Sequence, residues 1–194
     1  MSGIVGSKFN IRGSGLVGSL GTDGQHMLSS GAGVSNVFET VAAGGNSPSF
    51  KVYKTSSQTS LSPSTQHKIT WQTEEWDTDG AFDLSNDKFV VPTDKDGKYI
   101  FSGHFYSDGW GNTRQFDDYR ITWYKNGAEQ ERLIMVEYGH TQYQGGAFVF
   151  YADLDAADYV ELYFWSDQGS GTTGNLVGVA GPNSPTFWGG YKIG

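Results

Sequence analysis

Short runs of alternating apolar and polar residues follow one another along most of this chain. The clearest run lies between Phe82 and Phe101, where aromatic and β-branched residues alternate with polar ones around Pro92 and Gly97. Such alternation is typical of β-strands with one buried face. No window of the chain shows an apolar stripe at helical spacing, so we expect no long helix.

From His67 onward the same pattern predicts a series of short strands. The predicted strands are His67–Gln72, Ala81–Leu84, Lys88–Val91, Gly97–Tyr106, Asp118–Lys125, Glu131–Val136, Thr141–Ala152, Asp158–Trp165 and Thr186–Ile193. Between two of these runs, Asn126-Gly127 is a strong signal for a hairpin turn. The stretch Asp94–Gly97 indicates another turn, in which Gly97 takes a positive φ. Many short strands separated by turns predict a sandwich or a barrel.

The first third of the chain has a different composition, rich in Gly, Ser and Thr. Such a segment is either a flexible tail or a set of short strands that order only against other chains or a scaffold. We favour the second interpretation because apolar residues, among them Ile4, Val5, Phe9 and Ile11, recur through it. These four are the candidate anchor contacts. The polar stretch around Pro63 predicts a boundary, which gives an anchor segment at 1–65 and a folded domain at 66–194.

Composition and charge narrow the classes of function. The 194 residues carry a formal charge of −8 with scattered acidic residues. Since we find no basic face, we expect no nucleic-acid partner. The 28 glycines and the 15% aromatic content favour turns and strands. The chain has no cysteine, and we identify neither a signal peptide nor an apolar run long enough to enter a membrane.

Three motifs, in order, resemble the C1q-like family of jelly-roll domains. The first places Phe82, Asn86, Phe89, Pro92, Gly97, Tyr99 and Phe101 in that family's aromatic, Asn, aromatic, Pro and Gly-x-Tyr-x-Phe pattern. The second is Leu154…Asp158-Tyr159-Val160-Glu161-Leu162, and the third is Thr186-Phe187-Trp188-Gly189 near the end of the chain. The resemblance covers about residues 69–194. It implies an all-β C1q/TNF-type jelly-roll sandwich, preceded here by a Gly-rich short-strand extension, that assembles as a homotrimer.

The leading segment departs from that family because no collagen-like Gly-X-Y run precedes the domain. Residues 21–33 instead resemble Gly-rich phrases of bacteriophage tail-fibre and other virion proteins. This resemblance implies a location on a virion, as a fibre, spike or capsid decoration, with capsid or tail proteins as partners of the N-terminal segment. The rival interpretations are a soluble carbohydrate-binding module that works outside a virus and a glycan-cleaving depolymerase.

Motifs for catalysis are absent from the sequence. The four histidines have no metal-ligand spacing, and no Gly-x-Ser-x-Gly motif occurs. The 21 acidic residues offer many carboxylate pairs, so their spacing alone does not single out a glycosidase pair. We expect that the protein is not an enzyme.

Two binding sites are candidates. Asp108, Asp117 and Asp118 lie in or beside predicted loops and are candidate calcium ligands; the simpler alternative is that they are solvated loop carboxylates. Trp76, Trp110 and Tyr143 stand near polar residues in predicted loops, where their rings could stack on sugars while Asn112, with Asp77, Asp79 and Asp108, bonds the sugar hydroxyls. The alternative for these rings is loop packing or a trimer contact.

Overall fold

The computed structural model describes residues 25–28, 37–40, 46–108, 116–139, 144–167 and 173–193. The chain divides into two units, Met1–Gly45 and Asn46–Gly194. In the first unit, β1 (Gln25–Leu28) pairs with β2 (Val37–Thr40) in antiparallel register. The four candidate anchor residues and most of the 21–33 phrase lie outside the described residues, so the anchor role stays a prediction.

The described residues of the second unit are all-β. Its strands are β3 (Ser49–Tyr53), β4 (Gln58–Leu61), β5 (His67–Lys68), β6 (Thr73–Asp77), β7 (Phe82–Asp83), β8 (Lys88–Val90), β9 (Gly97–Asp108), β10 (Phe116–Lys125), β11 (Ala128–Gly139), β12 (Gln144–Leu154), β13 (Tyr159–Asp167), β14 (Gly174–Leu176) and β15 (Phe187–Lys192). The described ranges contain no helix of any length, and hence none that could cross a membrane.

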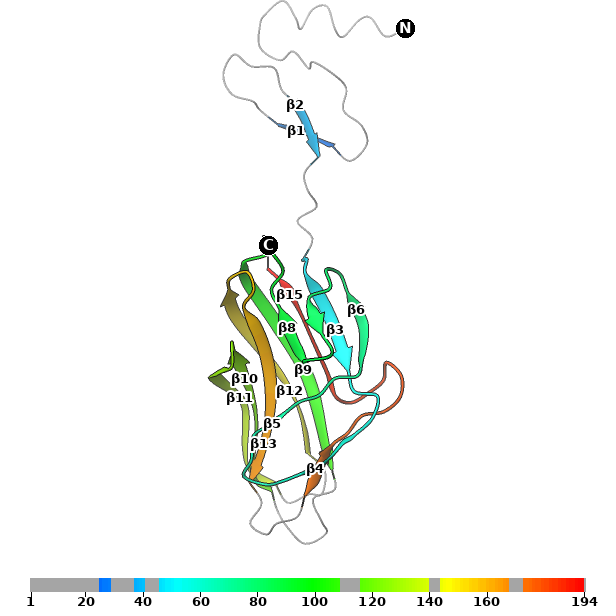
Figure 1. The fold of residues 1–194 in the computed structure, drawn as a ribbon, viewed down its shortest axis with the longest axis vertical. Helices are drawn as coiled ribbons and strands as arrows, with labels where there is room; N and C mark the ends of the chain where they lie inside the picture. Colours follow the sequence, from blue (N-terminus) through cyan, green and yellow to red (C-terminus); the bar gives the residue numbers. More distant parts are fainter. Residues whose placement is uncertain are drawn as a thin grey trace, which may run out of the picture. The chain divides into compact units, whose positions relative to one another are not determined.

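The strands form two antiparallel sheets that face each other (Figure 1). The first sheet has the order β11-β10-β13-β8-β7, with β5 added beside β13. The second has the order β4-β14-β9-β15-β3-β6, with β12 on the other side of β9. The chain alternates between the sheets, from β8 to β9, back to the β10–β11 hairpin, and on through β12 to β13. This connectivity confirms the predicted all-β sandwich of jelly-roll type.

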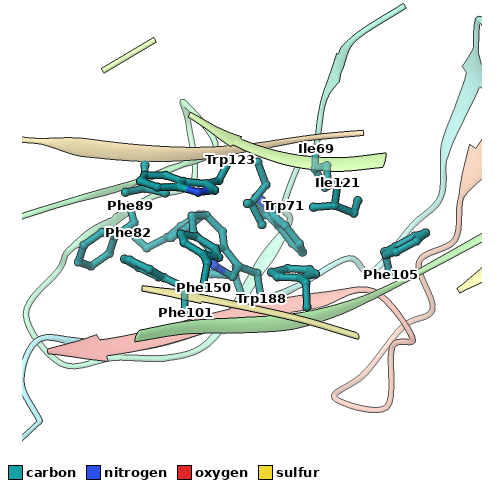
Figure 2. Close-up of a cluster of buried hydrophobic side chains, with 14 of the residues drawn as sticks. Ile69, Trp71, Phe82, Phe89, Phe101, Phe105, Ile121, Trp123, Phe150 and Trp188 are labelled. Carbon is teal, nitrogen blue, oxygen red and sulfur yellow. The ribbon is translucent and has the colours of Figure 1, made fainter. Parts of the chain in front are cut away.

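The space between the sheets is filled by aromatic rings (Figure 2). Trp188 on β15 is fully buried and contacts the rings of Phe50 and Phe101 at 5.1 and 5.9 Å between centroids. Trp123 from the first sheet stacks on Phe150 from the second at 5.0 Å. Each such ring removes a large apolar area from water, and burial of one side chain contributes about 1.5–3 kcal/mol. Many of the aromatic residues in this aromatic-rich sequence therefore form the core.

The predicted hairpin turn is present. Asn126 and Gly127 take φ values of 52° and 77° between β10 and β11, and a two-residue type I′ hairpin turn requires positive φ at both positions. The turn predicted at Asp94–Gly97 lies slightly earlier, because the Lys95 N–H donates to the Pro92 carbonyl at 3.2 Å and Gly97 is already the first residue of β9. Gly97 has a φ of 136°, which a residue with a side chain rarely adopts.

The predicted domain boundary needs correction. β3 lies inside the second sheet, between β15 and β6, and its Phe50 is part of the core. β4 also belongs to that sheet, so the jelly roll begins at Asn46 and not at residue 66. Only the first two residues of the predicted strand 67–72 are a strand, because the chain then crosses from β5 in the first sheet to β6 in the second.

Candidate functional site

The strand register gives the jelly roll two distinct ends. At one end lie the residues that flank the segments 109–115, 140–143 and 168–172. There Phe116 is opposite Gly139, Asp118 is opposite Asp167, Gln144 is opposite Ser107 and Asn175 is opposite Asp108. We call this the loop end.

The opposite end holds both the start and the finish of the jelly roll (Figure 1). The Lys192 N–H donates to the Pro48 carbonyl at 3.0 Å, and the Ile193 N–H donates to the Lys98 carbonyl at 2.7 Å. We call this the stem end. The unit thus receives its N-terminal segment at one end and presents its described loop flanks at the other.

Of the four residues proposed to bind sugar, only Trp76 belongs to the part of the chain that the structure describes, so the predicted site stays a prediction. Trp110, Asn112 and Tyr143 lie outside the described residues, in segments whose flanks are at the loop end. Trp76 lies on β6, an edge strand, and is opposite Lys51 on β3.

Two of the carboxylates predicted to bond sugar hydroxyls, Asp77 and Asp79, accept hydrogen bonds within the fold. Asp77 accepts the backbone N–H groups of Ala81 at 3.0 Å and Phe82 at 2.7 Å, which closes the turn after β6. Asp79 accepts the hydroxyl of Ser47 at 2.5 Å and that of Thr78 at 2.7 Å. These hydrogen bonds hold the pKa of Asp79 below its usual range. Both side chains therefore stabilise the start of the jelly roll.

The predicted calcium ligands lie at the loop end. Asp108 accepts a hydrogen bond from the Asn175 amide at 2.9 Å. Asp117 and Asp118 belong to β10, and Asp118 is opposite Glu137 on one side and Asp167 on the other. The described residues contain no group of three or more His, Cys, Asp or Glu placed to hold a metal. Calcium stays a prediction.

Large apolar side chains are exposed on the outward face of the second sheet. Tyr151 on β12 is 67% exposed and Val149 is 55% exposed. The register places Tyr151, Ile100 and Tyr191 in one row across β12, β9 and β15. A pocket of about 350 Å³ lies beside this row, lined by Lys98, Tyr99, Tyr151, Ala152, Asp153 and Ile193. We call this surface the β12 face. The sequence did not single out its exposed residues Val149 and Tyr151, because their exposure depends on long-range strand pairing.

A second exposed group surrounds Trp76, whose side chain is 46% exposed. The Lys51 ammonium lies 5.6 Å from the centroid of the Trp76 ring and 5.4 Å from that of Phe187. Lys51 also forms an ion pair with Glu75 at 2.6 Å. The sequence singled out Trp76, placed Phe187 in a motif of the C1q-like resemblance, and gave no signal for Lys51 or Glu75.

One charged side chain is fully buried between the sheets. The Lys54 ammonium donates to the Thr70 carbonyl at 2.6 Å and to the Thr70 hydroxyl at 3.0 Å, while the Gln58 amide oxygen lies at 3.4 Å. Burial lowers the pKa of Lys54 from 10.5 to about 8, against a smaller opposing effect of Asp87. Lys54 holds the segment that crosses between the two sheets.

Comparison with known proteins finds similar folds only. No family model matches the chain, and no curated protein does. The globular domain of zebrafish complement 1qA protein is 13% identical with a TM-score of 0.49, over 76% of this chain and 98% of that one. Murine APRIL is 12% identical with a TM-score of 0.48, over 75% and 98% of the two chains. The assignment of the jelly-roll class rests on the sheet order and register described above.

Proposed function

We propose that this chain is a non-enzymatic virion protein of a bacteriophage, a trimeric fibre, spike or capsid decoration. The observation that carries the proposal is the polarity of the jelly roll. The N-terminal segment joins at the stem end, and the described flanks of the three loop segments lie at the loop end. In this proposal residues 1–45 attach the module to the particle, and the jelly roll binds glycans on the host surface. The resemblance of residues 21–33 to virion phrases supports the virion as the scaffold.

The trimer is supported by the β12 face. β12 is an edge strand with β9 as its partner, and it presents Val149 and Tyr151 to solvent. Exposed apolar surface of this kind marks an interaction site. When each copy packs its β12 edge on the next copy, the heterologous contacts close into a ring around a three-fold axis. Such a ring covers the apolar row without needing a disulfide.

Deletion of the N-terminal segment tests the virion role. A chain of residues 46–194 keeps all thirteen strands described for the jelly roll and is expected to fold and form trimers, but not to join particles. Cryo-electron microscopy of particles assembled with the full chain or with the shortened chain measures the occupancy. Full occupancy by the shortened chain would place the attachment in the jelly roll.

The exposed Trp76 ring favours a second candidate function, a soluble carbohydrate-binding module that is not attached to a virion. The two functions differ in one respect: the soluble module leaves no copies on purified particles, whereas the virion protein is present at a fixed number per particle.

A further inference from the structure

We propose that Trp76, Phe187 and the Lys51–Glu75 ion pair form a binding site for an uncharged glycan on the outward face of the second sheet. This site deepens the glycan-binding part of the proposed function. It is distinct from the β12 face, because Trp76 and Lys51 lie on β6 and β3, whereas Val149 and Tyr151 lie on β12, on the other side of β9. It also differs from the site predicted around Trp110 and Tyr143.

A β-bulge sets the position of the Trp76 ring. The pairing of β6 with β3 changes register between Lys51 and Val52, so that Glu75 has no residue opposite it. Bulges often occur where a strand must re-aim a side chain. Here the shift puts Trp76 opposite Lys51, and both side chains reach the same surface. A tryptophan ring is usually well buried, and an exposure of 46% is therefore informative.

The neighbouring side chains supply the two kinds of contact that a sugar needs. The rings of Trp76 and Phe187 present apolar faces to the C–H side of a pyranose. The Lys51 ammonium between them donates hydrogen bonds, and the Glu75 carboxylate accepts them. Behind Phe187, the His104 ring stacks at 6.2 Å between centroids, and its Nδ1 lies 2.6 Å from the Pro185 carbonyl. This stacking supports the Phe187 ring from its neighbouring strand.

The charges of the site favour an uncharged ligand. Lys51 and Glu75 neutralise each other at 2.6 Å, which leaves no unpaired cation for an acidic sugar. Glu74 adds negative charge to the same edge strand, and burial together with the nearby Asp77 raises the pKa of Glu74. Acidic polymers are therefore repelled. The hydroxyl groups of a neutral sugar can accept hydrogen bonds from Lys51 and donate them to Glu75.

The spacing of the rings favours a chain of sugars over a single one. Trp76 on β6 and Phe187 on β15 are separated by two strand spacings, about 10 Å. This distance exceeds the width of one pyranose ring. The ligand class is thus a neutral oligosaccharide or polysaccharide that lies across the strands.

Affinity electrophoresis of the full chain tests the proposal. The gels contain dextran, mannan or hydroxyethyl cellulose as neutral probes, and alginate or polygalacturonate as acidic probes. The wild-type chain is expected to be retarded by at least one neutral polymer and by neither acidic one. Trp76→Ala is expected to weaken that binding about tenfold, which corresponds to 1.4 kcal/mol. Trp76→Phe keeps an aromatic face and is expected to retain most of the affinity.

Val179→Ala provides the matched control, because Val179 is exposed to a similar degree but lies outside the site. The proposal is overturned if Trp76→Ala binds as well as the wild type, if no neutral polymer retards the wild type, or if acidic polymers alone do. The molar mass of each variant is measured in parallel. A wild-type monomer that binds dextran contradicts the trimer and leaves the glycan site supported, so the two failures are distinguishable.

Discussion

Replacement of Lys54 by methionine is expected to change how the stability of the jelly roll depends on pH. Lys54 is fully buried, and its pKa in the folded chain is about 8 against 10.5 for an ordinary lysine. The folded protein therefore binds the Lys54 proton less tightly than the unfolded chain does. Between these two pKa values unfolding takes up a proton, so the free energy of unfolding rises with pH there.

The size of the effect follows from the pKa difference. Each pKa unit corresponds to about 1.4 kcal/mol, so the buried charge costs roughly 3 kcal/mol below pH 8. Burial raises the pKa of Tyr99 to about 12, and the unfolded tyrosines ionise near pH 10, so stability falls again at higher pH. The effect of Lys54 on stability is therefore best measured between pH 7.5 and pH 9.5. Across this range Lys54 is expected to add about 2 kcal/mol to the free energy of unfolding.

Guanidinium unfolding, followed by tryptophan fluorescence at fixed protein concentration, measures this dependence. The wild-type midpoint is expected to rise from pH 7.5 to 9.5, and the Lys54→Met midpoint is expected to rise much less. Arg132→Met removes an exposed cation from β11, away from the β12 face, and should keep the wild-type slope. Parallel curves for the wild type and Lys54→Met would refute the reasoning, because the rise would then come from another group.

Three further substitutions test the fold and the loop end. Gly97→Val places a Cβ at a φ of 136° and 3.1 Å from the Lys192 Cε, so we expect a loss of about 1–3 kcal/mol; an unchanged melting temperature would contradict the turn. Trp188→Ala removes the fully buried ring that contacts Phe50 and Phe101, with an expected cost of about 3–5 kcal/mol in denaturant unfolding, whereas Trp188→Phe should cost less. Trp110→Ala is expected to lower the adsorption of particles to host cells without changing the mass of the trimer, and normal adsorption would identify Trp110 as a packing residue.

Local patterns predicted most of the strands and two of the turns. Alternation identified the strands around Phe101 and Phe150 because one face of each strand is buried and the other is not. The Asn126-Gly127 turn was predictable because its positive φ values suit these two residues and few others. The three motifs of the C1q resemblance lie on these same strands.

The features that the sequence did not predict depend on contacts between distant parts of the chain. β3 was missed because Ser49–Tyr53 follows a Gly-rich stretch and becomes a strand through its pairing with β15, more than 130 residues later. The buried position of Lys54 has no local signal, since it precedes the polar residues Thr55 and Ser56. Likewise, Lys51 and Phe187 join Trp76 through the pairing of three strands, which the order of residues does not reveal.

The molar mass of the full chain in solution tests the proposed assembly most directly. Light scattering after size-exclusion chromatography at micromolar concentration is expected to give three times the chain mass of 21.1 kDa. Tyr151→Glu places a charge at the centre of the β12 face and is expected to give monomers that keep the strand content of the wild type. A wild-type chain that runs as a stable monomer, or a Tyr151→Glu variant that remains trimeric, would contradict assembly through the β12 face.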